Sequence, residues 1–456
     1  MDGMFMDATQ YTAVGRNLAD GLGSFWRPYF TNKYYINSIE FNFNEQTPLG
    51  FALFAAWFKV LGDSLYVERF FILASYIINI FLMRALWRLV VPSKSNFWIL
   101  PVFLYGLFPI IFWTYQHNML ENPMASFILL AAYFGILAIQ QREKSILFAS
   151  ISGAMIFLAF MVKGVPGLFP LALFFSFWLW NSKQFNFKRM LLLSSITTLS
   201  LLALFSLLFL FDESKASMSF YLEARLLNRI SEAPTVGSRF YIISDFLQQI
   251  IVPIILVVIA QVYNAKKRVK LENLNLVYFF ITLGLAGVLP IMLTKVQRGF
   301  YITPAYPFIA IGLAILIVPS LEKLIVTIGQ KARRVYRLLG FASFLSLIII
   351  TIVLAGKPKR DKQLLKDVYT IGTTIGSGHL LVCSLDFMME DWSPKSYFMR
   401  YFQIEFDALR TPFPADRERR YALFKKGEVV GSNLRPLNLD LKLYTLYEYV
   451  EVEQKR

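Results

Sequence analysis

The stretch SILFASISGAMIFLAFMVKGVPGLFPLALFFSFWLW, residues 145–180, indicates the fold class of this chain. Two apolar runs, at about 145–162 and 165–181, flank KGVPG, a tight turn that contains both glycine and proline. A run of about 18 to 22 apolar residues is long enough to cross a hydrocarbon core of about 30 Å as a helix. Because backbone groups in lipid must be satisfied within their own segment, we expect both runs to be membrane-spanning helices.

The rest of the chain has a similar composition. Its 456 residues are 56% hydrophobic and 16% aromatic, with a mean hydropathy of +0.51, whereas soluble domains have fewer apolar residues and more charge. The alternating pattern of a membrane β-barrel is absent from the sequence. We predict an all-α polytopic membrane protein with about ten spans. The other spans are expected at about 69–91, 97–114, 119–139, 189–211, 246–264, 275–294, 302–320 and 336–355.

Basic residues gather in every second loop between these predicted spans. The positive-inside rule places such loops in the cytoplasm. The alternate loops, residues 1–68 and the tail after about 356 are then exoplasmic. The net charge of +16 belongs to this orientation signal, so we do not predict nucleic-acid binding. The basic loops hold Arg84, Arg88 and Lys94; Arg142 and Lys144; Lys183, Lys188 and Arg189; Lys266, Lys267, Arg268 and Lys270; and Lys331, Arg333, Arg334 and Arg337.

The chain is expected to have three parts. Residues 1–68 form an exoplasmic loop with interfacial helices and candidate catalytic acids, and residues 69–355 form the transmembrane helical domain. Residues 356–456 form a small exoplasmic α/β domain, because charge rises and alternating stretches such as YALFKKGEVV appear there. In the first part, DATQYTAVGRNLAD is typical of a short amphipathic helix in the membrane interface, and a second helix follows Pro48.

Three carboxylates lie at the exoplasmic starts of predicted helices. Asp7 fits an N-cap, Glu45 stands just before Thr47-Pro48 where it complements a helix dipole, and Glu121 lies at the mouth of a span. Each also has a functional interpretation, because a positioned carboxylate can deprotonate a hydroxyl group. The spacing alone leaves both interpretations open.

Two exoplasmic segments concentrate cations. Lys295 and Arg298 precede Tyr301 in TKVQRGFYITP, and Arg225 and Arg229 lie in YLEARLLNR. Charge-assisted bonds from such groups suit a phosphate. The alternative is that these side chains extend to lipid headgroups.

The sequence offers no diagnostic metal site. Cys383 is the only cysteine, and His117 and His379 lie far apart in the sequence, so no His or Cys ligand cluster is present. No cofactor is firmly expected. The acids could bind a divalent metal, but their spacing is not that of a known oxygen-ligand set.

Four short motifs follow one another along residues 4–320. Asp7 and Tyr11 lie in MDATQY, Glu45 lies in FNEQTPL, Glu121 lies in MLENP, and Tyr301 opens a Tyr-x-x-Pro-x-x-Pro element. Their order resembles that of the GT-C fold glycosyltransferases that use polyprenyl-phosphate-linked sugars. The resemblance is closest to the group containing the bacterial aminoarabinose transferase of lipid A and the protein O-mannosyltransferases. Two positions depart from that pattern: Ala8 stands where the group has an acid, and Gln46 where a basic residue is common.

The resemblance implies a role for each candidate residue. Asp7 would lie nearest the reacting centre, with Glu45 and Glu121 as further catalytic acids, Glu121 also serving the acceptor or a metal. Tyr301, Arg229, Lys295 and Arg298 would contact the lipid phosphate, and Tyr11 and Arg225 would support the acceptor or the loop. Gln46 would remove one phosphate contact that the group normally has.

In that group a transmembrane helix precedes the first acidic loop. Here the sequence begins just before Asp7, and its first residues are not typical of a signal peptide. We therefore expect about 25 residues of apolar helix encoded upstream of Met1, the length that spans a bilayer. An in-frame stop codon close to Met1 in the genomic DNA would exclude this.

The expected activity is that of a multi-pass glycosyltransferase of the bacterial inner membrane, with its site on the periplasmic side. It would move a sugar from a polyprenyl-phosphate carrier, such as undecaprenyl phosphate, to a lipid A-like glycolipid, a protein or a glycan, with inversion. A flippase or transporter of a lipid-linked sugar is one alternative, but it predicts charges deep within the spans. A surface-polysaccharide ligase and a purely structural role are the others.

Overall fold

The computed structural model describes residues 3–31, 43–223, 234–327, 360–384, 386–387, 392–408, 420–428, 430–431 and 433–450, with positions 334, 338, 345, 349, 352 and 353. Contacts within the chain divide it into two compact units. Unit 1 contains residues 1–43, 51–68 and 354–456. Unit 2 contains residues 44–50 and 69–353.

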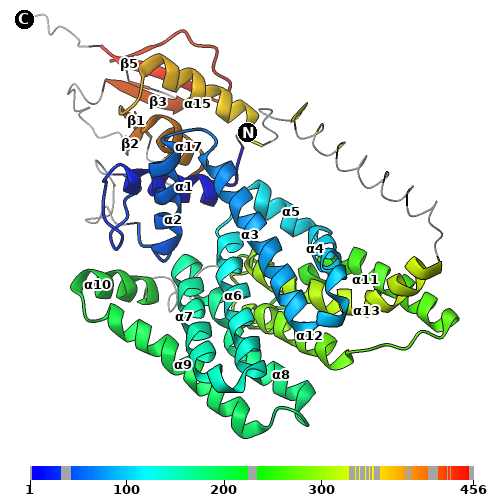
Figure 1. Ribbon diagram of the computed structural model, residues 1–456. Coiled ribbons are helices and arrows are strands. Elements are labelled where there is room, and N and C mark those ends of the chain that lie inside the picture. Colours follow the sequence, from blue (N-terminus) through cyan, green and yellow to red (C-terminus); the bar gives the residue numbers. More distant parts are fainter. Residues whose placement is uncertain are drawn as a thin grey trace, which may run out of the picture. The chain divides into compact units, whose positions relative to one another are not determined.

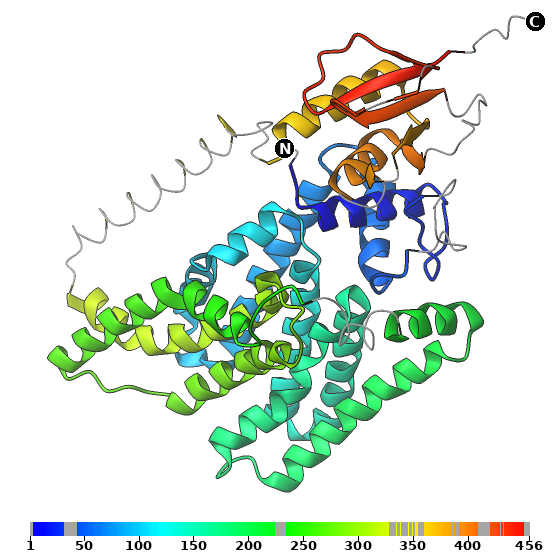
Figure 2. The same ribbon diagram turned by 180° about the vertical axis from the view of Figure 1, so that it is seen from behind.

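Unit 2 is a bundle of helices (Figures 1 and 2). Seven helical segments among the described residues are long and apolar enough to cross a membrane, which confirms the predicted class of a helical membrane protein. These segments are α3 (Val67–Val90), α6 (Glu121–Gln140), η2 with α7 (Arg142–Lys144 and Ser145–Lys163), α9 (Phe187–Leu208), α11 (Tyr241–Lys267), α12 with η6 (Leu274–Val288 and Leu289–Leu293), and η7 with α13 (Gly299–Ala305 and Tyr306–Thr327).

The predicted count of ten spans is not confirmed. The span expected at 97–114 is two helices, α4 (Ile99–Gly106) and α5 (Pro109–Gln116), bent by 79°. The bend lies at Pro109, which begins α5 and cannot continue the helix before it. The span expected at 165–181 consists of η3 (Val165–Ala172) and α8 (Leu173–Asn181) and is shorter than the others. Most of the span expected at 336–355 lies outside the described residues.

Helices in unit 2 pack closely where side chains are small. A Cβ atom on Gly153 of α7 would lie 2.4 Å from the carbonyl oxygen of Thr197 in α9. At the same contact the Thr197 hydroxyl donates to the Ala149 carbonyl at 2.9 Å, and the Ser200 hydroxyl donates to the Ser150 carbonyl at 2.9 Å. Small residues and hydroxyl bonds are the usual means of joining helices within lipid. Two shorter elements, η1 (Pro92–Phe97) and α10 (Asp212–Phe220), complete the unit.

Unit 1 combines the beginning of the chain with its tail. It contains α1 (Met6–Ala19), most of α2 (Leu49–Leu61), α15 (Lys362–Ile375), α17 (Trp392–Phe402) and one mixed sheet. The strand order is β2-β1-β3-β5-β4, in which β1 pairs in parallel with β2 and β3, and β5 pairs antiparallel with β3 and β4. The strands are β1 (Leu380–Cys383), β2 (Glu405–Ala408), β3 (Tyr421–Lys425), β4 (Leu434–Pro436) and β5 (Tyr444–Tyr449).

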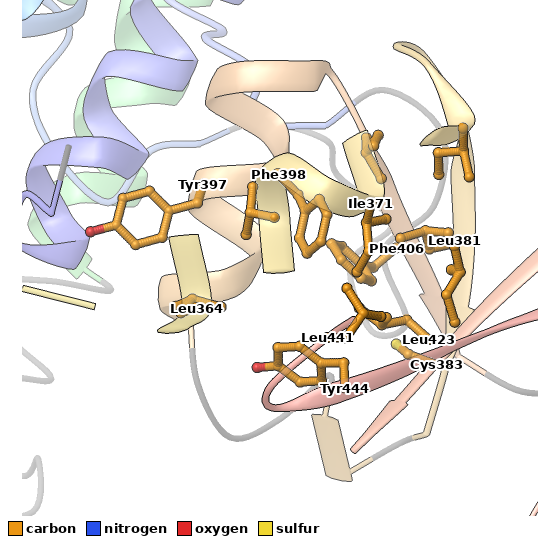
Figure 3. Packing of buried hydrophobic residues seen from close by; sticks show 14 of the residues in the cluster. Leu364, Ile371, Leu381, Cys383, Tyr397, Phe398, Phe406, Leu423, Leu441 and Tyr444 are labelled. Atoms are coloured by element: carbon orange, nitrogen blue, oxygen red, sulfur yellow. The ribbon is translucent and has the colours of Figure 1, made fainter. Parts of the chain in front are cut away.

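The core of this sheet follows the alternation of a strand. Leu381 and Cys383 of β1 face α15 and α17 and pack with Ile371 and Phe398 (Figure 3). Val382, between them, lies in the cluster on the other face of the sheet. The α/β character predicted for the tail is therefore present.

Helix α1 differs from its prediction in two ways. Phe5, not Asp7, is the N-cap, and Asp7 lies in the first turn. Ten consecutive residues, from Ala8 to Asn17, are buried, so α1 is a core helix and not a half-exposed one. The helix ends in a Schellman motif: Gly21 has a φ of +85°, and the Leu22 N–H donates to the Asn17 carbonyl at 2.8 Å.

Candidate active site

A buried ion pair lies at one end of the bundle in unit 2. The Lys163 Nζ is 2.7 Å from the Glu121 Oε1, with side chains that are 5% and 1% exposed. Glu121 is the first residue of α6, and Leu120 is the N-cap. Glu121 therefore does not cap this helix, which was one of the two interpretations of its position in the sequence. Burial of both charges means that neither can be removed without leaving the other in a low-dielectric site.

Local backbone geometry places both members of this pair. Helix α7 ends at Lys163 because Gly164 has a φ of +79°. A Cβ at Gly164 would lie 1.7 Å from the Tyr221 hydroxyl oxygen, so only glycine fits there. Before α6, Asn118 adopts a left-handed conformation with a φ of 55°.

Aromatic side chains cover the lysine. The Lys163 Nζ lies 5.4 Å from the centre of the Phe300 ring, a cation–π distance. Trp113 stacks on Phe300, with ring centres 5.6 Å apart and planes inclined by 16°, and it also contacts His117. Tyr301 follows Phe300 in η7 and is half-buried. The ion pair and the predicted phosphate-binding tyrosine therefore lie at the same end of the bundle.

The segment 44–50 reaches the same place. The Thr47 hydroxyl donates to the Phe160 carbonyl near the end of α7 at 2.9 Å. A Cβ on Gly50 would lie 2.9 Å from Leu120 and 3.0 Å from the Val162 carbonyl. These contacts fix half-buried Glu45 on the same end of unit 2 as Glu121, although the two lie far apart in the sequence.

Lys295 and Arg298 are exposed in the loop before η7. Buried Gln297 between them fixes this loop, because its Nε2 donates to the carbonyls of Thr294 at 2.7 Å and Arg239 at 2.9 Å. Its Oε1 accepts from the Ile242 N–H at 2.9 Å. Gln297 thus holds the cationic loop against the segment that precedes α11.

Asp7 and Tyr11 belong to unit 1. Asp7 is half-buried in the first turn of α1. Tyr11, 4% exposed, packs edge-on against Phe43 at 6.3 Å and Phe51 at 5.8 Å. The Tyr11 ring thereby joins α1 to the start of α2.

A second buried charge cluster anchors α1 to the tail. The Arg16 Nη1 donates to the Arg400 carbonyl at 2.7 Å. Arg400, 1% exposed, donates to Glu68 at 2.5 Å and to Asp63 at 2.6 Å. Burial lowers the pKa of Arg16 to about 10. Burial also opposes the charge of Arg400, but Glu68 and Asp63 outweigh it and raise the pKa of that guanidinium.

No family model and no curated protein sequence matches the chain. Two solved structures match it. The structure of ArnT from Cupriavidus metallidurans bound to undecaprenyl phosphate aligns over 97% of this chain and 93% of that one, with a TM-score of 0.63 and 11% identity. Its apo structure aligns over 96% and 92%, with a TM-score of 0.60 and 11% identity.

The chain has the ArnT fold. The resemblance found in the short sequence motifs is thereby confirmed at the level of the fold, over nearly the whole chain. At 11% identity the alignment shows a shared fold and does not transfer residue roles.

The ArnT-fold bundle brings some of the predicted residues together. Glu45, Glu121, Lys295, Arg298 and Tyr301 all lie in unit 2, whereas Asp7 and Tyr11 lie in unit 1. Arg225 and Arg229 lie outside the described residues. Among the described residues, no group of three or more His, Cys, Asp or Glu side chains is placed to hold a metal ion.

Sequence reasoning missed Lys163 and Gln297. Lys163 ends an apolar run, where a lysine is typical of a membrane-boundary anchor. Gln297 lies in a polar loop, where a single sequence gives no sign of burial. The one available signal for Lys163 was the KGVPG turn, because a glycine directly after a charged residue at a helix end marks a close backbone approach.

Proposed function

We propose that this chain is a membrane glycosyltransferase that moves a sugar from a polyprenyl-phosphate carrier to an exoplasmic acceptor, with inversion at the sugar. The observation that carries the proposal is the ArnT fold over 97% of the chain, shared with a structure that binds undecaprenyl phosphate. The carboxylates and cations at one end of unit 2 support it, because transfer from a lipid phosphate needs both kinds of group.

The proposed reaction is a single displacement. The acceptor oxygen forms a bond to the anomeric carbon while the bond from that carbon to the phosphate oxygen breaks. The electron pair of the broken bond leaves with polyprenyl phosphate, and the acceptor proton passes to the Asp7 carboxylate. Positive charge that develops at the anomeric carbon is offset by the nearby carboxylates, as in other oxocarbenium-like glycosyl chemistry.

The cations would hold the leaving phosphate. Lys295 and Arg298 are exposed, and Tyr301 lies beside the aromatic cover of Lys163. We assign these three groups to the phosphate, together with Arg229 and with Arg225 in support. Glu121, paired with Lys163, and Glu45, at the same end of unit 2, are the further catalytic acids of this proposal.

A transfer assay tests the function. Purified protein is mixed with a panel of polyprenyl-phosphate sugars and a membrane extract, and mass spectrometry follows free polyprenyl phosphate and the glycosylated product. We expect acceptor-dependent release that falls by about 10² to 10⁴ in Asp7→Asn, the range for loss of a general base. Asp20→Asn, at the exposed C-cap of the same helix, is the matched control and should keep its activity.

Two outcomes would contradict the proposal. If no donor is consumed but the lipid crosses between leaflets in liposomes, the protein is a flippase. If Asp7→Asn and Asp20→Asn transfer equally well, the fold assignment stands but Asp7 is not the base. The configuration of the product at the anomeric carbon tests inversion separately.

A further inference from the structure

A groove with two arginines lies on the outside of unit 2, between α3 and α6. Its volume is about 410 Å³. The Gln140 side chain of α6 donates to the Leu89 carbonyl of α3 at 3.1 Å, which holds the two helices side by side at the end where both terminate. The groove is lined by Phe81, Arg84, Ala85, Arg88, Leu89 and Tyr133.

The two guanidinium groups lie on one face of α3. Arg84 and Arg88 are four residues apart, so they are neighbours on the helix surface. At about 1.5 Å of rise per residue, Arg84 lies about 9 Å from the end of α3 at Val90, and Arg88 about 3 Å from it. Both charges therefore lie within about two turns of the end of α3.

Neither arginine has a carboxylate partner among the residues that the structure describes. Arg84 lies 5.3 Å from the Trp98 ring. Its buried Nε has no hydrogen-bond partner within the described part of the chain. The ion pair at this end of α3 joins Lys94 to Glu322 at 2.5 Å. Two unneutralised guanidiniums, one with an unused buried donor, form a site for an anion.

The face around the groove is apolar and exposed. Ile77, Ile78 and Phe81 of α3 are 43%, 48% and 59% exposed. Only 39% of the apolar stretch of α3 is buried within the protein. In a spanning helix such a face contacts lipid, so the occupant of the groove must be amphipathic, with an anionic head at the arginines and an apolar body along Phe81 and Tyr133.

We infer that this groove binds an anionic phospholipid, with its phosphate between Arg84 and Arg88. Basic pockets between helices at the cytoplasmic end of the spans are the usual sites for such headgroups. This inference does not depend on the transferase activity. The competing explanation is that both arginines only set orientation and extend to bulk headgroups, in which case any basic residue at this end would behave alike.

The full-length protein in neutral detergent is examined by native mass spectrometry with phosphatidylglycerol or phosphatidylcholine of the same acyl chains. Wild type should retain phosphatidylglycerol in preference, and Arg84→Gln/Arg88→Gln should bind it about tenfold more weakly, as expected for two lost phosphate contacts. The control is Arg142→Gln/Lys144→Gln, two exposed basic residues in η2, which should bind like wild type.

A second variant keeps the test independent of orientation. Ala85→Leu fills the groove and leaves both charges, so it should also lose phosphatidylglycerol while keeping the orientation signal. The inference is overturned if the control double variant loses as much lipid as Arg84→Gln/Arg88→Gln, or if Ala85→Leu binds like wild type. It is also overturned if soluble glycerol phosphate competes fully with the lipid, because the site would then recognise free phosphate.

Discussion

At the scale of single residues, the buried pair of Glu121 and Lys163 affects both the stability of the protein and the position of a candidate catalytic carboxylate. A carboxylate 1% exposed at the end of a bundle is tolerated only while its partner is present, since an unpaired buried charge costs about 3–5 kcal/mol. The pair also holds the carboxylate of Glu121 in a fixed position, 2.7 Å from a lysine that Phe300 covers. Removing both charges together should therefore separate the contribution of the pair to stability from its contribution to activity.

Lys163→Met should destabilise the protein by about 3–5 kcal/mol, because it leaves Glu121 buried and unpaired. Glu121→Gln/Lys163→Met should recover most of this stability but not the transfer activity. Thermal unfolding and the donor-release assay measure the two effects. Lys215→Met, at an exposed lysine of α10, is the control, and equal stability of Lys163→Met and Lys215→Met would contradict the role of the pair.

Gln297→Leu should raise KM for the polyprenyl-phosphate donor about tenfold, because the loop that carries Lys295 and Arg298 loses its three side-chain bonds. The variant removes no charge, so a rise in KM with little change in kcat would mean that the displaced loop binds the donor more weakly. Gln141→Leu, at an exposed glutamine, should leave both constants as in wild type. A Gln297→Leu enzyme with unchanged KM would show that the cations bind phosphate without this support.

At the scale of elements, periodicity and run length predicted where most helices lie, but not where a run bends or which helices are buried on all sides. The apolar runs gave α3, α6, α7 and α9 nearly at their observed bounds. The bend between α4 and α5 lies at Pro109. The apolar run is long enough for one span, so its length alone predicted a single straight helix. Burial of α1 on all sides could not be predicted, because the segments that cover it come from elsewhere in the chain.

Helix α17 should hold unit 1 together through Arg400. Arg400→Met leaves Glu68 buried without its main partner, and we expect a loss of about 3–5 kcal/mol in the stability of this unit. Hydrogen exchange of α1 in the full-length protein measures it, because Arg16 bonds to the backbone of residue 400. Arg435→Met, at an exposed ion pair, should leave α1 protection unchanged.

The tail should lose stability in acid through its surface carboxylates. Hydrogen bonds from Lys366 and Lys442 lower the pKa of Asp440 from 3.8 to about 2, and those from Arg420 and Arg435 lower the pKa of Glu448 below 4.5. A depressed carboxyl pKa contributes stability that is present above the unfolded value and lost as pH falls through the folded one.

Asp440→Asn/Glu448→Gln should therefore melt at a lower temperature than wild type at pH 6. The difference should shrink as pH falls from about 4.5 towards 2. Thermal unfolding followed at pH 6, 4 and 3 measures this. A difference that stays constant across the series would mean that these ion pairs contribute nothing that depends on ionisation.

At the scale of the whole molecule, the orientation of the chain is the expectation with the widest consequences. It rests on the alternation of basic loops along the sequence. The helical membrane class and the ArnT fold could be anticipated from apolar runs and ordered motifs, and both are present. The predicted count of ten spans is not confirmed. The grouping of residues 1–43 with 354–456 could not, because nothing in either segment encodes the other as its partner.

Single cysteines should report this orientation directly, because Cys383 is fully buried in β1 and should not react. Ser238→Cys lies in an exposed segment predicted to be exoplasmic, and Ser182→Cys in an exposed loop predicted to be cytoplasmic. A membrane-impermeant maleimide applied to intact spheroplasts should label Ser238→Cys only. Labelling of Ser182→Cys alone would invert the assignment.

The bond from Arg16 to residue 400 joins positions 384 residues apart. At about 5 to 20 residues per second, the ribosome needs roughly 20 to 80 s to pass from one to the other. During that time α1, ten of whose residues are buried in the folded unit, has no α17 to cover it. Completion of unit 1 is thus the last folding event of biosynthesis, and a chain that lacks its final hundred or so residues leaves α1, with Asp7, unsupported however well its spans have inserted.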